Sequence, residues 1–326
     1  MKNKINAIVF SKDRASQLKL FLESVEENAP DIFDLNVIVS HTDEDYDKAY
    51  GRVVNDPEFG HVNFVGAEAE FKEQVLKLLK TDHEYSCFFL DDDIIYKEVK
   101  IEDITSQIES DDDVVCFSLR LGKNTTKCYT LGADNEIRDI EIEEGYIKWD
   151  WTVHYLDFGY PFAMDGHVFR RKDIYKLTRK SKFANVEELE MALYDFAEMF
   201  PRNMMVAYGD SRLVNAPAGR VQQSLDDEMT MTVKESEARV RRKLMNNAFL
   251  HGDFINLESI DFSNIEGCHQ KIDFGNTKLD VVSSSLDKIA IKKYGKRWEE
   301  LSDGEQSEIN ESIDKIRSMA KQKEND

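Results

Sequence analysis

The first third of the chain alternates between short apolar runs and longer amphipathic stretches. Apolar runs with the composition of buried strands cover residues 5–10, 35–40, 61–65 and 85–90. Two of the stretches between them carry apolar residues at the spacing of one helix face, at Leu18, Phe21, Leu22 and Val25 and then at Phe71, Val75, Leu78 and Leu79. Repeated alternation of strand and helix with short connections predicts a mostly parallel sheet with helices on both faces.

The pattern changes in the middle of the chain. A helix over residues 101–110 and a strand over residues 114–119 continue the alternation, but residues 120–165 have the glycine, threonine and aromatic content of hairpins and loops. Helical spacing returns over residues 186–200, and a further strand is predicted over residues 204–208. The second half is therefore expected to be built differently from the first.

We expect one α/β domain made of two halves and followed by a small addition. The halves are residues 1–119 and residues 120–280, and residues 281–326 have the composition of short helices. A chain of 326 residues is long enough for a large domain with such an appendage. The helical appendage is the candidate surface for docking or homo-oligomerisation.

Composition narrows the range of partners and compartments. The net charge of −21 opposes passive adhesion to nucleic acid or anionic membranes, although a local basic groove remains compatible with it. The first apolar run is too short for a signal sequence or a membrane span, and the four cysteines show no CxxC spacing. We therefore expect a soluble cytoplasmic protein with reduced cysteines and no membrane insertion.

Three consecutive carboxylates follow the apolar run over residues 85–90. Isolated carboxylates are costly to desolvate, so acidic residues at the end of a buried strand usually meet a cation or lie at an open sheet edge. Asp91 and Asp93 offer the hard oxygen ligands that Mg²⁺ or Mn²⁺ takes together with substrate phosphates. A solvated turn made of aspartates is the alternative interpretation.

A polar segment also follows the first strand. Ser11, Lys12, Asp13 and Arg14 come directly after residues 5–10. Ligands bind beyond the carboxyl ends of the strands in parallel sheets, so the topology predicts that this segment and the three aspartates share one edge. The alternative is a polar loop in which Ser11 or Asp13 caps the next helix, which is compatible with a ligand contact.

Several blocks in a fixed order resemble the nucleotide-sugar-dependent glycosyltransferases of GT-A fold. FSKDRASQL looks like the nucleotide-binding opening of these enzymes, and FFLDDDIIY looks like their DXD element. CFSLRLGKNTTKCY, the Trp149-Asp150-Trp151 cluster, YPFAMDGHVFRRKDI and LVNAPAGRVQ look like blocks of a bacterial and phage glycosyltransferase family. The resemblance covers roughly residues 5–275 and leaves the tail unassigned.

The resemblance implies a metal site. In GT-A enzymes the DXD pair holds a divalent cation that bridges the donor diphosphate, which points to Asp93 as the first ligand of Mn²⁺ or Mg²⁺. Asp91 would contact either the metal or the donor ribose, and Asp92 would lie beside the donor. His269 stands where these enzymes often have a further metal ligand, although a lone histidine is more often structural. The cation would neutralise charge on the leaving nucleoside diphosphate.

The resemblance also implies the donor contacts. The segment after the first strand would form the nucleotide end of the pocket, with Lys12 or Arg14 near the base or the phosphates. Arg120, Lys123 and Asn124, in LRLGKN, would contact the diphosphate or the donor sugar. A surface hairpin is the alternative for LRLGKN.

Two further acidic residues receive catalytic roles from the resemblance. Asp165 precedes Gly166, which would let the backbone approach a ligand, and is a candidate for binding sugar hydroxyls. An inverting transferase needs a carboxylate base for the acceptor hydroxyl. Glu187, Glu188 and Glu190 fit the place, and Glu190 is the first choice because the family pattern has a Leu-Glu pair there. Acidic residues in the first turn of a helix also stabilise its dipole, which is the competing explanation.

The combined expectation is a metal-dependent glycosyltransferase that moves a hexosyl or pentosyl group from a nucleotide diphosphate sugar, with UDP as the expected nucleotide, to a hydroxyl acceptor. That acceptor is either a glycan or a hydroxymethylated base of phage DNA, which the basic stretch over residues 239–243 would serve. Trp149, Trp151, Tyr155 and Tyr160 suit an acceptor site or the core. A sugar nucleotidyltransferase and a catalytically inactive binding or assembly protein are the alternatives.

Overall fold

The computed structural model describes residues 4–66, 70–136, 138–143, 145–217, 242–274, 293–294, 301–302 and 304–305. The chain divides into two compact units, residues 1–217 with 255–274 and residues 218–254 with 275–326. Every predicted site residue belongs to the first unit. In the second unit residues 242–250 are helical, and almost all of the expected helical appendage and part of the basic stretch lie outside the described residues.

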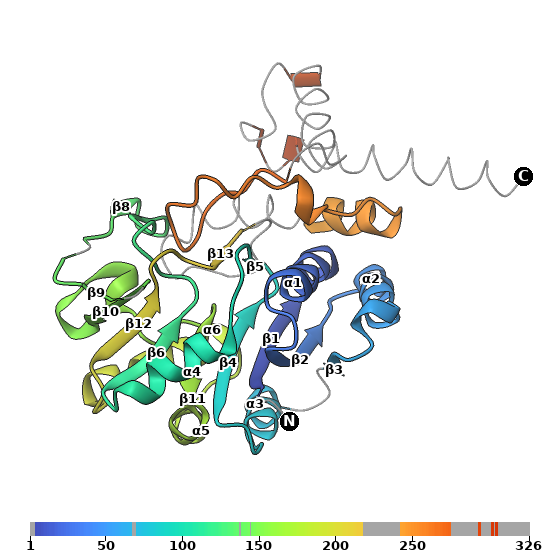
Figure 1. Cartoon of the computed structure of the whole chain (residues 1–326). Helices are drawn as coiled ribbons and strands as arrows, with labels where there is room; N and C mark the ends of the chain where they lie inside the picture. Colours follow the sequence, from blue (N-terminus) through green and yellow to red (C-terminus); the bar gives the residue numbers. More distant parts are fainter. Residues whose placement is uncertain are drawn as a thin grey trace, which may run out of the picture. The chain divides into compact units, whose positions relative to one another are not determined.

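Nine strands of the first unit form one central sheet (Figure 1). In spatial order they are β3 (Asn63–Gly66), β2 (Phe33–Ser40), β1 (Ile5–Lys12), β4 (Tyr85–Leu90), β11 (His167–Arg170), β6 (Val114–Ser118), β12 (Met204–Tyr208), β10 (Tyr146–Asp150) and β9 (Glu141–Glu143). Only β11 and β10 run opposite to the other strands of this sheet. The predicted α/β class with a mostly parallel sheet is confirmed.

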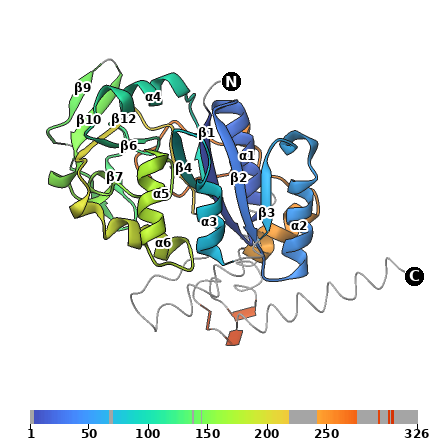
Figure 2. The ribbon, with the colours of Figure 1, turned by 90° about the horizontal axis from the view of Figure 1, so that it is seen from below.

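Helices cover both faces of the sheet (Figure 2). They are α1 (Ala15–Asn28), α2 (Glu44–Val54), α3 (Phe71–Leu79), α4 (Ile101–Ser110), α5 (Arg171–Lys180) and α6 (Val186–Tyr194). Successive residues of a strand point to opposite faces, and Phe88 and Phe89 of β4 show this. Phe89 lies 5.1 Å, between ring centroids, from Phe21 of α1, whereas Phe88 stacks on Phe10, which in turn lies 5.5 Å from Phe71 of α3.

Short elements occupy the region predicted to contain hairpins and loops. β7 (Lys127–Cys128) pairs with β8 (Ala133–Asp134), and the 3-10 turns η2 (Trp151–Val153) and η3 (Leu156–Gly159) follow β10. Elsewhere β5 (Asp93–Ile95) pairs with β13 (Leu213–Asn215), and the remaining 3-10 turns are η1 (Pro57–Phe59), η4 (Ala197–Met199) and η5 (Leu257–Ser259).

The helix predicted over residues 186–200 is shorter in the structure. α6 ends at Tyr194, and the separate turn η4 continues the chain. Because a 3-10 turn also brings every third residue to one side, the apolar spacing continues past the break, and Phe200 reaches Phe162 with their rings 5.6 Å apart. Periodicity in the sequence therefore marked the buried face correctly and the end of the helix wrongly.

Two tryptophans that the sequence offered for an acceptor site belong to the core. Trp149 and Trp151 are 1% and 7% exposed, and their indole N–H groups donate to the backbone carbonyls of Phe158 and Arg202 at 2.9 and 3.1 Å. Buried indoles usually find such a partner. Packing explains both residues without a ligand.

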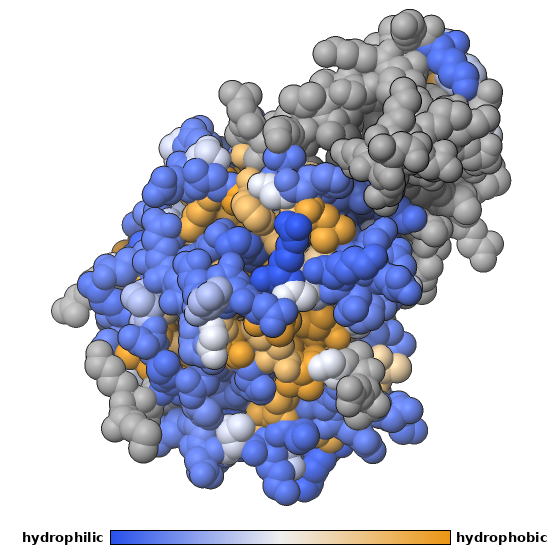
Figure 3. All heavy atoms as spheres, turned by 90° about the vertical axis from the view of Figure 1, so that its right-hand side faces the viewer, coloured by the Kyte–Doolittle hydropathy of each residue, from blue (hydrophilic) through white to orange (hydrophobic). Residues whose placement is uncertain are grey.

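One face of the molecule is shown in Figure 3, where hydrophilic side chains predominate and apolar atoms are visible in the hollows between them. A largely hydrophilic face is expected for a chain in which 33% of the residues are charged. In the parts of the chain that the structure describes, none of the helices combines the length and the apolar character needed to cross a bilayer.

Gly122 is required where two loops pass close together. A Cβ on Gly122 would lie 2.2 Å from the backbone nitrogen of Ser211. We expect Gly122→Ala to lower the free energy of unfolding by about 3 kcal/mol in urea denaturation, because the backbone must move apart. Gly51→Ala in α2 is the control, since nothing lies within 4 Å of the added methyl group, and it should stabilise slightly. Equal stability of the two variants would contradict this close approach.

Candidate active site

The carboxyl ends of β1 and β4 meet at one edge of the sheet. Phe10 is in register with Leu90, and the backbone N–H of Asp91 donates to the carbonyl of Phe10 at 3.2 Å. The chain therefore leaves both strands at neighbouring points. This confirms the prediction, made from topology, that residues 11–14 and the three aspartates share an edge, although β1 extends two residues further than predicted, to Lys12.

Asp91 is hydrogen-bonded by residues 11–14, which form the end of β1 and the turn after it. Its carboxylate accepts hydrogen bonds from the Ser11 hydroxyl at 2.9 Å, the Lys12 backbone N–H at 3.2 Å and the Arg14 guanidinium at 3.0 Å. Burial raises the pKa of Asp91 to about 6 against the lowering effect of Arg14. Arg14 also donates to Asp92 at 2.6 Å, so one cation serves two carboxylates.

The rest of this segment holds the loop in place. Asp13 adopts a left-handed backbone conformation (φ 57°), and its carboxylate accepts from the backbone and hydroxyl of Thr42 at 2.8 and 3.1 Å. The Tyr50 hydroxyl lies 2.7 Å from the Ser11 hydroxyl and accepts from the Arg14 backbone at 3.0 Å. Sequence reasoning missed Tyr50, and the only signal for it was the weak amphipathic pattern of α2. Within residues 11–14 only Lys12 is exposed, whereas Ser11, Asp13 and Arg14 are buried.

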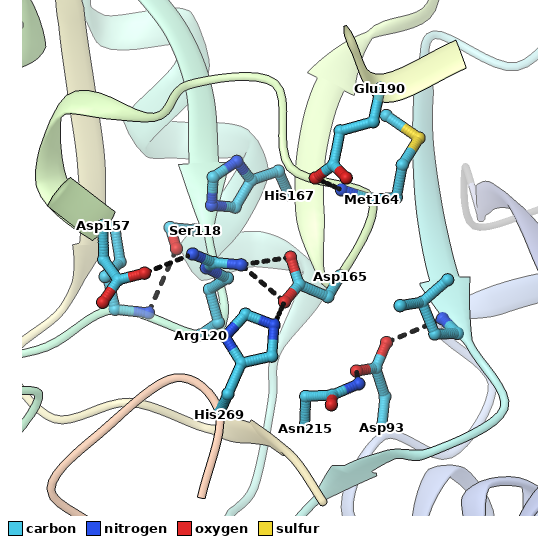
Figure 4. A network of polar contacts seen from close by, with 12 residues as sticks. Asp93, Ser118, Arg120, Asp157, Met164, Asp165, His167, Glu190, Asn215 and His269 are labelled. Atoms are coloured by element: carbon cyan, nitrogen blue, oxygen red, sulfur yellow. Dashed lines mark hydrogen bonds and ion pairs between the residues drawn. The ribbon is translucent and has the colours of Figure 1, made fainter. Parts of the chain in front are cut away.

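Asn215 connects the other two aspartates, and Figure 4 shows its contact with Asp93. Its amide nitrogen donates to Asp92 at 2.8 Å and to Asp93 at 2.9 Å. The second oxygen of Asp93 accepts from the backbone N–H of Leu90 at 2.8 Å. Asp93 is completely buried, and burial followed by the nearby charges of Asp165 and Asp92 holds its pKa well above the usual range.

A second buried network surrounds Arg120 (Figure 4). Its guanidinium donates to both oxygens of Asp165 and, at 2.9 Å, to Asp157. His269 Nε2 lies 3.2 Å from Asp165, and burial of Asp165 is outweighed by Arg120 and His269, which keep its pKa below its usual value. In the structure this 3% exposed cation balances two carboxylates, and its expected contact with the donor stays a prediction.

The other residues of the LRLGKN block join loops. Asn124 donates to the Ser211 hydroxyl and to the Ile265 carbonyl, both at 2.9 Å, and accepts from the Ser211 backbone at 2.8 Å. Lys123 is exposed. Gly166 similarly approaches protein backbone, since its N–H donates to Phe88 and its carbonyl accepts from Leu119, both at 2.9 Å.

Glu190 faces the Asp165 side of the site rather than the helix start (Figure 4). Its carboxylate accepts from the backbone N–H of Met164 at 3.3 Å, and burial, reinforced by Asp165, raises its pKa to about 7. Glu188 is the residue that serves the first turn, where it accepts from the Ala184 backbone at 2.8 Å. The helix-dipole explanation therefore applies to Glu188 and leaves Glu190 available for chemistry.

Aromatic rings and a neutral histidine adjoin Glu190 and Asp165. Tyr160 and Tyr194 stack with their ring centroids 4.8 Å apart, and burial and then Glu190 raise the pKa of Tyr160. His167, which sequence reasoning overlooked, is fully buried, and burial lowers its pKa to about 4. Tyr155, by contrast, is 82% exposed.

The donor atoms near Asp93 suit a hard divalent cation. Oδ1 of Asp92 and Oδ1 of Asp93 both lie within 2.9 Å of one atom, the Asn215 nitrogen, so the two oxygens converge. Within the described residues, no three His, Cys, Asp or Glu side chains are grouped to hold a metal ion. Mg²⁺ and Mn²⁺ are typically held by one or two carboxylates with waters and substrate phosphates, a requirement that this pair meets.

Removing Arg120 should destabilise the protein severely. Arg120→Met would leave Asp157 and Asp165 buried without their cation, and we expect a loss of about 3–5 kcal/mol in the free energy of unfolding. Urea denaturation measures the loss, with Arg138→Met as the control because Arg138 is exposed and pairs with Glu136 on the surface. Equal stability of the two variants would show that the buried network contributes little.

No protein-family model matches the chain. Over 191 residues the chain is 29% identical to the bifunctional glycosyltransferase pgtA of Dictyostelium discoideum, a match that covers 53% of this chain and 24% of that protein. The chain thus has homology to a glycosyltransferase and spans about a quarter of its length.

Solved structures also match at low identity. S. aureus TarS in complex with UDP-GlcNAc is 13% identical, with a TM-score of 0.41, and the match covers 74% of this chain and 66% of that one. The mannosyltransferase PcManGT of Pyrobaculum calidifontis, in complex with GDP-Man and Mn²⁺, is 12% identical, with a TM-score of 0.40 and coverage of 73% and 62%.

Proposed function

We propose that this chain is an inverting, metal-dependent glycosyltransferase that uses a nucleotide diphosphate sugar. The observation that carries the proposal is the presence, in one site, of two converging carboxylate oxygens on Asp92 and Asp93 and of a separate carboxylate, Glu190, with a pKa of about 7. The first arrangement suits a cation and the second suits a general base at neutral pH. Homology to a glycosyltransferase supports the same assignment.

Asp93 and Asp92 would hold Mn²⁺ or Mg²⁺. Asp91, the partner expected from the sequence, is engaged by Ser11, the Lys12 backbone and Arg14, and Asp92 therefore takes its place. His269 fits as a further ligand through Nδ1, because metal-ligating histidines usually give their other nitrogen to a carboxylate, here Asp165. When bound, the cation supplies positive charge for the donor diphosphate.

Glu190 would act as the base for the acceptor. As the acceptor oxygen forms its bond to the anomeric carbon, the bond from that carbon to the diphosphate breaks and Glu190 takes the hydroxyl proton. The nucleoside diphosphate leaves with the bonding electrons. The stacked pair Tyr160 and Tyr194 lies beside Glu190 and offers an aromatic face for the acceptor.

Residues 11–14 would bind the nucleotide, for which UDP is our first choice. Lys12 is exposed at the site edge and can reach a phosphate, while Asp13 and Thr42 fix the loop. A glycan is the favoured acceptor because the net charge of −21 opposes DNA, and a hydroxymethylated DNA base is the second candidate.

A screen of UDP-, GDP- and TDP-sugars for hydrolysis with Mn²⁺ present tests the proposal. We expect one nucleotide class to be hydrolysed slowly without an acceptor, and a chelator to abolish the reaction. Release of pyrophosphate from a nucleoside triphosphate and a sugar phosphate would instead indicate a nucleotidyltransferase. Failure to hydrolyse any donor, under conditions where Mn²⁺ and UDP also fail to bind, would refute the assignment.

A further inference from the structure

Two paired strands and an adjoining segment place a carboxylate, an amide and an imidazole side by side. Asp93 of β5 pairs with Asn215 of β13, and Asn215 forms a parallel bridge with His269. Paired residues on adjacent strands present their side chains on the same face. Figure 4 shows the three side chains in the same part of the site, with Asn215 directed at Asp93.

Asn215 lies between two carboxylates that need a hydrogen-bond donor or a cation beside them. It is 3% exposed, and its single amide nitrogen is shared by Asp92 and Asp93. Two buried carboxylates that contact the same nitrogen atom lie close enough to repel each other, and the amide N–H groups reduce that repulsion. A bound cation between the same two oxygens would serve the same purpose and would repel the N–H groups.

The carboxamide can adapt to either situation by rotation alone. Its oxygen and nitrogen have nearly the same shape and exchange places when the group turns by about 180°. Carbonyl oxygen is a good ligand for Mg²⁺ and Mn²⁺. The backbone of Asn215 is fixed on both sides, because its N–H donates to the carbonyl of Cys268 at 2.8 Å and its carbonyl accepts from the N–H of Gln270 at 3.0 Å. The exchange we consider is therefore a turn of the side chain and not of the backbone.

We propose that Asn215 is a positioning residue that exchanges its amide N–H for its carbonyl oxygen when a divalent cation binds between Asp92 and Asp93. Without the cation it holds the two carboxylates together. With the cation it contributes an oxygen and fixes the spacing of the ligands. This inference rests on the proposed metal-dependent function.

The test compares the melting temperatures of the full chain without metal and with saturating Mn²⁺. Asn215→Asp keeps the shape and an oxygen but loses the N–H groups, so its metal-free melting temperature should fall by about 5 °C or more. Mn²⁺ should then raise the melting temperature of this variant more than that of wild type. Asn215→Leu offers neither group and should gain less from Mn²⁺ than wild type does.

Asn135→Asp is the matched control. Asn135 is also buried and donates to a carboxylate, Asp157, at 3.0 Å, but it lies outside the proposed cation site. Its loss of stability should not be recovered by Mn²⁺. If wild type gains from Mn²⁺ but Asn215→Asp gains no more, the inference about Asn215 is wrong and the metal site stands. If wild type gains nothing, the metal site itself is refuted and this inference with it.

Discussion

Glu190→Gln is expected to lower kcat for sugar transfer by roughly 100- to 10,000-fold, the usual contribution of a positioned base. Glutamine keeps the size of the side chain and can still accept from the Met164 backbone, as Glu190 does at 3.3 Å. It cannot take the proton of the acceptor hydroxyl. Affinity for the donor should therefore stay within a factor of about two, because donor binding depends on other residues. Steady-state kinetics and donor titration measure the two effects separately.

The pH dependence of the wild-type enzyme tests the role of Glu190 as the base independently. Burial raises the pKa of Glu190 to about 7, and a base works only when deprotonated. We therefore expect log kcat/KM to fall with unit slope as the pH drops below about 7, and the residual activity of Glu190→Gln to lack this acid limb. Glu188→Gln, at the exposed helix start, should leave the profile unchanged. Full activity in Glu190→Gln would exclude Glu190 as the base.

Asp93→Asn should separate function from stability. We expect Mn²⁺-dependent UDP binding to weaken roughly 100-fold, because a neutral amide replaces a proposed ligand. The stability of the folded protein should change little, because removing a buried carboxylate that Asp165 and Asp92 repel offsets the loss of one of its two accepted hydrogen bonds, from Asn215 or from Leu90. Calorimetry of UDP binding and thermal melting measure the two outcomes.

The chain contains a suitable control for this variant. Residues 111–113 are also three consecutive aspartates before an apolar strand, and the Asp112 side chain is fully exposed. Asp112→Asn should change neither UDP binding nor melting. If Asp93→Asn binds UDP and Mn²⁺ as wild type does, the cation is held elsewhere.

The two triple-aspartate stretches also show what the sequence could and could not predict. Alternating apolar runs were sufficient for the α/β class and for the shared edge of β1 and β4, because those features depend on local periodicity and on the short connections of a parallel sheet. The difference between Asp93 and Asp112 is tertiary. Asp93 is buried through pairing with Asn215, a residue 122 positions away, and no local pattern encodes that contact.

Arg120 illustrates the same limit for cations. A basic residue after a strand was interpreted as a donor contact, but β11 lies between β4 and β6 and brings the nearby Asp165 against Arg120. Residue type alone does not reveal whether a cation will face a substrate or balance buried carboxylates. Glu190 was identified from the family pattern, and only the structure distinguishes it from Glu188 at the helix start.

The most direct test is a calorimetric titration of UDP into the wild-type chain with Mn²⁺ and, separately, with a chelator. We expect saturable binding at one site with Mn²⁺ and binding weakened by at least about tenfold without it, because the diphosphate and the carboxylates share the cation. Equal affinity for UDP with Mn²⁺ and with the chelator would contradict a cation-dependent donor site at Asp92 and Asp93. The same holds if UDP, GDP and TDP all fail to bind in the presence of Mn²⁺.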